Sequence, residues 1–214
     1  MKFETDIEAL NQLGGRLGSQ FGRHELNQLT QAASALGRLA ESGTSEQHRV
    51  RVTSAAKGYQ DSLKRARSSL GEREQHGLQA LTEARQERLG LRTDKFILPI
   101  VTAFQNAPDR KTRLEYLEQA VQTGDGRTLA ALIESPEFVT GIDRATLSSY
   151  LESAERKHAP DLADRREMFD SDREVIARAL EVGERIAAQA VDLESIERAE
   201  QADAAEAELK AATG

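Results

Sequence analysis

Cysteine and tryptophan are absent from the 214-residue sequence, and proline occurs only four times. Without cysteine, the chain can form neither disulfides nor thiolate metal sites. All four prolines lie between Pro99 and Pro160, so a helix can run uninterrupted through the long stretches on either side. Aromatic side chains are also scarce, at 4% of the residues. These shortages favour helices with narrow apolar stripes over a thick globular core.

Long apolar runs are missing as well. No window approaches the roughly 18 consecutive apolar residues of a membrane-spanning helix. The first residues, Met1 to Asp6, lack the basic start and apolar stretch of a signal peptide. We therefore expect a chain made in the cytoplasm without a signal peptide and without a conventional membrane-spanning helix.

The residues that are abundant are helix formers. Ala, Leu, Glu, Arg and Gln dominate the sequence. They predict an all-α fold in which two long amphipathic, coiled-coil-like helices flank a small bundle of short helices. The expected segments are amphipathic N-terminal helices over 1–44, a long helix over 45–94, a small helical domain over 95–160, and a long C-terminal helix with an acidic tail over 161–214.

A first packing surface is expected within residues 3–22. Apolar residues recur there with the 4-3-4-3-4 spacing of one helical stripe, and three glycines lie four apart on an adjoining line. A row of glycines lets another backbone approach closely. We expect this stripe to dock in an oligomer or on a membrane surface, and the alternative is a flexible amphipathic leader. The residues concerned are Phe3, Ile7, Leu10, Gly14, Leu17, Gly18, Phe21 and Gly22.

Heptad repeats mark the two long helices. In the first, the apolar spacing is regular up to Leu70 and resumes at Leu78 with a shifted phase, which is a stutter. In the second, two interleaved series recur every seven residues. The expected seam residues are Val52, Tyr59, Leu63 and Leu70 in the first helix, and Leu162, Phe169, Ile176, Ile186 and Leu193 in the second.

The two long segments carry opposite charge. Residues 45–95 contain 11 basic and 7 acidic side chains, whereas residues 161–214 contain 7 basic and 15 acidic ones. Opposite balances favour laying one helix along the other, or along a neighbouring subunit. Two independently solvated faces remain the alternative.

The polar residues form no recognisable catalytic or metal-binding motif. The four histidines lie on four separate segments, and no two have the i,i+4 spacing of a helical zinc pair. One Glu-x-x-His occurs, at Glu155–His158, whereas di-iron bundles use two. The acids of Asp170–Glu174 lack the glycine of a calcium loop and are interpreted as a charged helix face. We therefore predict no metal, no cofactor and no enzymatic activity.

The densest basic cluster is Lys64–Arg67. Acidic residues lie close to it along the chain, and no aromatic stacking platform accompanies it. We therefore expect no sequence-specific nucleic-acid binding, while loose electrostatic contact with packaged nucleic acid stays open.

One stretch resembles a known group of proteins. From Leu132 the chain reads Leu-Ile-Glu-Ser-Pro-Glu-Phe-Val-Thr-Gly-Ile, and after a predicted helix it reads His-Ala-Pro-Asp-Leu-Ala-Asp-Arg-Arg-Glu-Met-Phe, ending at Phe169. This pattern resembles an element of small helical structural proteins of tailed phages and prophages. The resemblance implies a virion component of the internal ejection-protein type, and it assigns no functional residues.

Three functions are therefore expected from the sequence. The leading hypothesis is a non-enzymatic, ring-forming protein of a tailed-phage virion that helps deliver the genome through the host envelope. Its partners would be other copies of itself and other virion proteins, with possible membrane-surface contact. The alternatives are a capsid assembly scaffold and a helical adaptor whose segment 95–160 binds a peptide.

Overall fold

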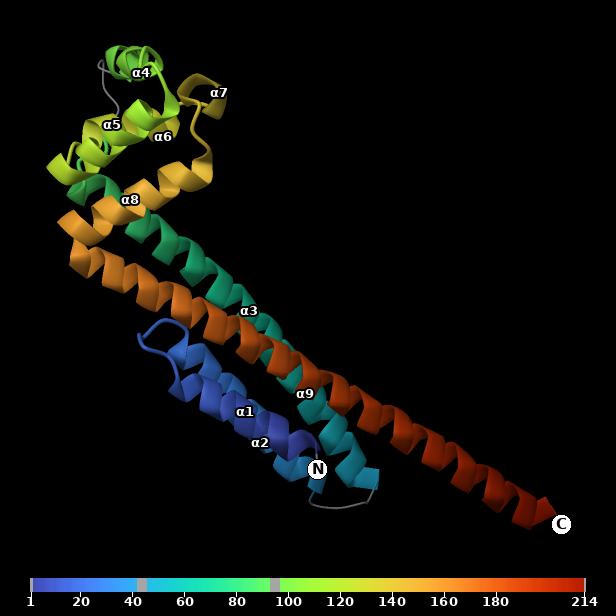
Figure 1. Ribbon diagram of the computed structural model, residues 1–214. Coiled ribbons are helices and arrows are strands. Elements are labelled where there is room, and N and C mark those ends of the chain that lie inside the picture. Colours follow the sequence, from blue (N-terminus) through green and yellow to red (C-terminus); the bar gives the residue numbers. More distant parts are fainter. Residues whose placement is uncertain (1, 42–45, 93–96, 214) are drawn as a thin grey trace. The chain divides into compact units, whose positions relative to one another are not determined.

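The computed structural model describes the backbone of residues 2–41, 46–92 and 97–213, and the side chains of residues 4–40, 48, 50–92 and 97–190. The described residues form α-helices joined by turns, and no strand occurs among them (Figure 1), which confirms the all-α prediction. The helices are α1 (Lys2–Gly15), α2 (Arg23–Glu41), α3 (Glu46–Arg88), α4 (Ile97–Gln105), α5 (Arg110–Thr123), α6 (Gly126–Glu134), α7 (Glu137–Thr140), α8 (Arg144–His158) and α9 (Pro160–Thr213).

The helices belong to two compact units. The first contains Met1–Gln75 and Phe169–Gly214, and the second contains His76–Met168. Helices α3 and α9 contribute residues to both. The heptad stutter between Leu70 and Leu78 coincides with the point at which α3 passes from the first unit to the second, so the phase change marks a change of packing partners.

Four helices share the core of the first unit. Figure 1 shows α1 and α2 lying side by side, and both contribute side chains to the same apolar core as α3 and α9. The positions that the heptads place on one face of each helix are the ones that are buried. The buried core residues are Leu10, Leu17, Leu26, Leu29, Ala33, Leu36, Ala56, Tyr59, Leu63, Leu70, Ile176, Ala179, Val182, Ile186 and Ala190.

The long helices contact each other within this unit. The Tyr59 hydroxyl donates to the carbonyl oxygen of Gly183 at 3.2 Å. A Cβ atom on Gly183 would lie 2.9 Å from Leu63 Cδ1, so the glycine lets α9 approach α3 closely. Burial, and secondarily the charge of Asp6, raise the pKa of the Tyr59 phenol far above its ordinary value. The structure therefore pairs the two long helices inside one chain, an arrangement that the sequence left open.

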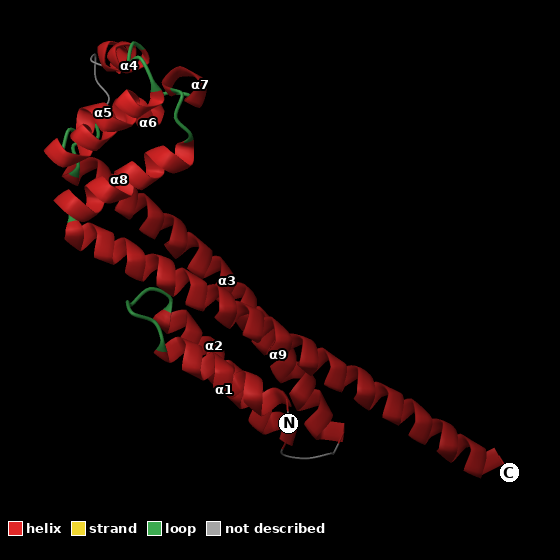
Figure 2. Ribbon diagram, viewed as in Figure 1, coloured by secondary structure: helices red, strands yellow, loops and turns green. Residues whose placement is uncertain are grey.

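Short helices of the second unit start and stop at clear local signals (Figure 2). Asp109, Asp125 and Asp143 are N-caps, and each accepts a hydrogen bond from the backbone N–H of the threonine three residues later, at 2.7, 3.1 and 2.8 Å respectively. These backbone hydrogen bonds lower the pKa of the Asp109 and Asp143 carboxyls. Gly124 and Gly141 end two helices with φ of 72° and 68°, in the left-handed region that favours glycine.

The core of the second unit is built from these short helices and from the adjoining parts of the two long ones. Fully buried side chains come from α4, α5 and α6 and from the turn before α8. They include Phe104, Leu117, Leu129, Leu132 and Ile142. No helix in the described parts of the chain combines the length and apolar content needed to cross a bilayer.

Candidate functional site

The predicted N-terminal packing surface lies in the core of the first unit. Leu10 is fully buried and Leu17 is 4% exposed, while Ile7 and Phe21 pack against the same core. The side chain of Phe3 lies outside the described residues. This stripe packs inside its own chain in the structure, and its expected contacts with an oligomer or a membrane stay a prediction.

The three glycines of that segment do not share one helix, contrary to the spacing argument. Gly14 lies in α1, but α1 ends at Gly15, and Gly18 and Gly22 belong to the turn before α2. Gly22 has φ of 72°, and a Cβ atom there would lie 2.6 Å from Ile176 Cδ1. Glycine is therefore required at position 22 by the turn and by close packing, not by a neighbouring backbone.

Asp172 holds the turn before α2 in place. From the sequence, this residue is interpreted as part of a charged helix face. Asp172 is only 1% exposed and accepts hydrogen bonds from the backbone N–H of Gly18 at 2.8 Å and of Ser19 at 3.0 Å. The Ser19 hydroxyl donates to the same carboxylate. Next to this contact, the rings of Phe21 and Phe169 lie 4.9 Å apart between centroids. Asp172 lies three residues after Phe169 and therefore occupies a core position of the heptad. An acidic residue at a core position is the sequence signal that could have predicted its burial.

A second buried carboxylate, Glu25, joins α2 to α3. Its Oε1 atom accepts from the Ser69 hydroxyl at 3.0 Å and pairs with the Arg73 guanidinium at 3.0 Å. Its Oε2 atom is buried and has no hydrogen-bond partner among the described residues. A buried carboxylate oxygen without a hydrogen bond is unfavourable, because it has lost its hydration without compensation.

A third buried carboxylate, Glu155, lies in the second unit and is 1% exposed. Arg85 donates from Nε to Glu155 Oε2 at 2.5 Å, and Arg166 donates from Nε to Oε1 at 3.0 Å. The other member of the Glu-x-x-His pattern, His158, contacts the carbonyl oxygen of Val121 through Nε2 at 2.6 Å. The motif is thus divided between two structural contacts that tie α8 to its neighbours.

Most of the predicted seam residues are buried, in both units. Val52, Tyr59, Leu63, Leu70, Ile176 and Ile186 are buried in the first unit, Leu162 is buried in the second, and Phe169 is partly buried. The side chain of Leu193 lies outside the described residues. The described part of the seam therefore lies within the chain.

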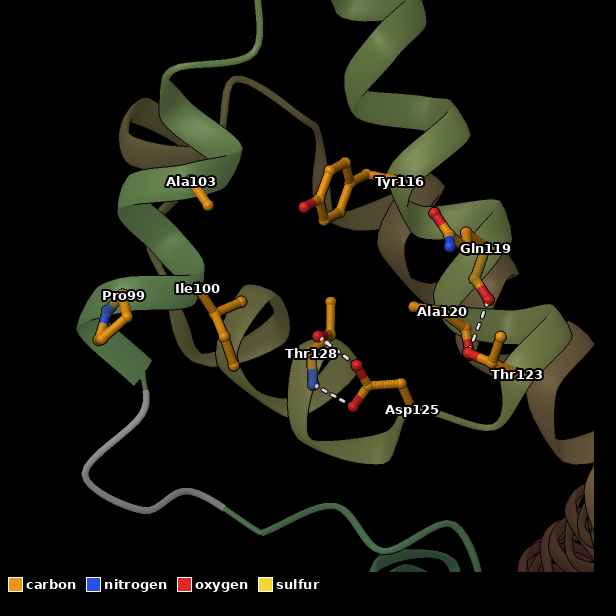
Figure 3. Close-up of a pocket in the computed structure, with 9 residues that line it drawn as sticks. All are labelled: Pro99, Ile100, Ala103, Tyr116, Gln119, Ala120, Thr123, Asp125 and Thr128. Carbon is orange, nitrogen blue, oxygen red and sulfur yellow. Dashed lines mark hydrogen bonds between the residues drawn. The ribbon is translucent and has the colours of Figure 1, made fainter.

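The second unit also carries an open groove of about 420 Å³ between α4, α5 and α6. Figure 3 shows Pro99, Ile100 and Ala103 of α4 across the groove from Tyr116 of α5, with Thr128 of α6 between them. The Tyr116 side chain is 46% exposed. The remaining lining residues are Gln119, Ala120, Thr123 and Asp125. The arrangement suits an apolar anchor held between α4 and the tyrosine ring.

Exposed apolar side chains accompany this groove on the same unit. Leu98 on α4 is 75% exposed and Phe138 on α7 is 88% exposed. Isolated exposed apolar residues are common, and Phe138 lies on a helix that contacts α4.

The three buried carboxylates are each used in contacts between elements of their own unit. No group of three or more potential metal ligands occurs among the residues that the structure describes. Comparison of the chain with protein-family models, with curated proteins and with solved structures found no match in any of the three.

Proposed function

We propose that this chain is a non-enzymatic assembly protein that associates with copies of itself through the C-terminal part of α9. The observation that carries the proposal is the length of α9. The helix runs from Pro160 to Thr213, a length of 54 residues. Figure 1 shows the end of α9 extending beyond α1, α2 and α3.

A helix in water gains most of its stability from packing an apolar face against a partner. The stretch 191–213 is rich in alanine and glutamate and has few large apolar side chains. Helix propensity supports such a segment in part, and a second chain lying along it would supply a partner for packing. Self-association is therefore the arrangement in which the full length of α9 is used.

The resemblance of Leu132–Phe169 to helical phage proteins supports a more specific proposal. We propose a tailed-phage virion component of the ejection type, which forms a ring and helps the genome cross the host envelope. The charged, cysteine-free helices suit a protein that meets water on one face and neighbouring subunits on the other. The use of Glu25, Glu155 and Asp172 in structural contacts supports a role without catalysis.

Light scattering of the purified chain tests the self-association. We expect the full chain to form an oligomer and a chain ending at Ala190 to be monomeric, because the truncation removes the C-terminal part of α9 through which the copies are proposed to associate. Circular dichroism of the truncated chain shows whether the remaining helices stay folded. Monomers of the full chain at all concentrations, both in buffer and in detergent, would contradict the proposal.

The groove of the second unit favours one alternative function, a peptide-binding adaptor. Its apolar wall is formed by Pro99, Ile100 and Ala103 of α4, and the Tyr116 side chain across the groove is 46% exposed. An apolar side chain of a partner peptide would be held there, with the Tyr116 hydroxyl available for a hydrogen bond.

Peptides selected by display on the full chain test this alternative. Ala103→Glu introduces a charge into the groove and is expected to weaken binding of a selected peptide about tenfold or more, because a buried unpaired charge is unfavourable. Thr102→Glu, at an exposed neighbour that does not line the groove, is the matched control. Equal affinities for both variants would show that the groove is not the binding site.

A further inference from the structure

A polar groove of about 510 Å³ lies between α2 and α3 in the first unit. Two of its lining residues, Leu29 and Ala66, are apolar and buried. The other lining residues are polar, and those from α3 recur three or four positions apart, so they share one face of that helix. They are His24, Glu25 and Gln28 of α2, and Ser62, Arg65, Ser69 and Arg73 of α3.

Glu25 supplies the negative charge of this groove, and its side chain is only 6% exposed. Its Oε1 atom accepts from the Ser69 hydroxyl and pairs with Arg73, whereas its Oε2 atom has no hydrogen-bond partner among the described residues. Both partners of Oε1 line the groove themselves, and a carboxylate turns readily about its last bond. An N–H group of a ligand that donates to this carboxylate therefore compensates a buried acceptor that the chain leaves unpaired.

Arg65 supplies a positive charge in the same groove. It is exposed, and it donates from Nε to the backbone oxygen of Asp61 and from Nη2 to the Ser62 hydroxyl, both at 3.3 Å. Both acceptors are uncharged groups. Glu25 is the one acid among the described lining residues, and its ion pair is made with Arg73. A guanidinium carries five N–H groups, so Arg65 has donors left for an anionic group in the groove.

The two charges lie one to two turns of α3 apart. Glu25 is bonded at Ser69 and Arg73, which follow Arg65 by four and eight residues on the same helix. At about 1.5 Å per residue, this separation is roughly 6–12 Å along the helix axis. Opposite charges at this spacing, with an apolar surface in the same groove, are complementary to a small molecule that carries an ammonium group at one end and a carboxylate at the other.

We propose that the groove between α2 and α3 binds a small zwitterion, whose ammonium group donates to Glu25 and whose carboxylate is bound by Arg65. The carbon chain between the two charges lies against Leu29 and Ala66, and Arg73 keeps its ion pair with Oε1. Free amino acids and short peptides belong to this chemical class. The inference is independent of the proposed self-association, because the groove is formed by residues of one unit in one chain.

Three probes of equal chain length test the proposal. The probe 6-aminohexanoate carries both charges, hexanoate carries only the carboxylate, and hexylamine carries only the ammonium group. Saturation-transfer NMR titrations of the full chain measure their affinities. We expect 6-aminohexanoate to bind with a dissociation constant of about 10 mM or below, as an ordinary ligand of this size does.

The singly charged probes are expected to bind more weakly. Hexanoate should lose about tenfold or more in affinity, because it has no donor for the buried carboxylate of Glu25. Hexylamine should lose about threefold, because the ion pair that it lacks is with the exposed Arg65.

Two variants of the full chain locate the site. Glu25→Gln is expected to weaken 6-aminohexanoate about tenfold or more. Arg65→Gln is expected to weaken it about threefold and to leave the affinity of hexylamine unchanged, because hexylamine has no carboxylate. Lys64→Gln is the matched control, since Lys64 is an exposed neighbour that does not line the groove. Circular dichroism checks the folding of Glu25→Gln, and Arg65→Gln, at an exposed position, keeps the test valid if that variant is unfolded.

Three results would overturn the proposal. If 6-aminohexanoate does not bind at concentrations well above 10 mM, the groove does not take a zwitterion of this spacing. If hexanoate binds as tightly as 6-aminohexanoate, the ammonium group does not contact Glu25 and the groove is an anion site only. If Arg65→Gln and Lys64→Gln bind 6-aminohexanoate equally well, the carboxylate is bound elsewhere on the chain.

Discussion

Replacing Glu155 by alanine is expected to lower the free energy of unfolding of the second unit by about 3–5 kcal/mol, because the change leaves two largely buried cations without their shared carboxylate. The guanidinium side chains of Arg85 and Arg166 are only 16% and 23% exposed. In a unit of this size, such a loss corresponds to a melting temperature that is roughly 12 °C or more lower. Urea unfolding followed by circular dichroism measures the free energy, and hydrogen exchange of peptides from α8 assigns it to this unit.

Glu152→Ala provides the matched control. Glu152 lies on the same helix, three residues away, and is exposed, so its removal is expected to change the free energy of unfolding by about 0.5 kcal/mol or less. Equal effects of the two substitutions would show that the buried ionic contact contributes nothing special to the stability of α8.

The Glu155 cluster also predicts the behaviour of a fully apolar replacement. Arg166 Nη2 is buried and has no hydrogen-bond partner among the described residues, so part of the cost of burying this cluster is not recovered. The combined variant Arg85→Met, Glu155→Leu and Arg166→Met should therefore be considerably more stable than Glu155→Ala alone. If it is equally unstable, the loss in Glu155→Ala comes from the missing volume and not from the unpaired charges.

Gly126→Ala is expected to destabilise the second unit by about 3 kcal/mol or more, at the upper end of what overpacking causes. A Cβ atom on Gly126, the first residue of α6, would lie 1.8 Å from the backbone oxygen of Leu89 and 2.7 Å from that of Gly90. Both neighbours are backbone atoms, so no side-chain rotation relieves the clash. Thermal unfolding measures the loss, and hydrogen exchange at the start of α6 locates it.

Gly71→Ala is the control for the intrinsic effect of the substitution. Gly71 lies inside α3, is exposed, and would place its Cβ atom where nothing lies within 4 Å. In a helix interior alanine is favoured over glycine by about 0.5–1 kcal/mol, so this variant should be slightly more stable than the unaltered chain. A Gly126→Ala variant as stable as Gly71→Ala would contradict the close approach of α6 to the end of α3.

The long helices could be predicted because their signals are local. The heptad spacing before Leu70 and the series through Ile176 and Ile186 place one apolar stripe on each helix. The Asp-x-x-Thr starts at Asp109 and Asp143 are equally local, since the cap and the amide that it accepts lie within four residues. These local patterns do not depend on how the rest of the chain folds.

The N-terminal turn could not be predicted in the same way. Spacing alone continued one helix from Phe3 to Phe21, whereas α1 ends at Gly15. The turn that follows is held by Asp172, which is more than 150 residues away along the chain. An acid among other charged residues is typical of a solvated helix face, and only the approach of the turn makes this one a buried acceptor.

The sequence by itself determined the all-α class, the two long helices and the opposite charges of the long segments, because each depends on residues within a turn or two of one another. Only the tertiary structure decided that α3 and α9 pair within one chain and that Glu25, Glu155 and Asp172 are buried. Those features depend on which surfaces meet, and burial of a charge is favourable only where distant donors converge on it.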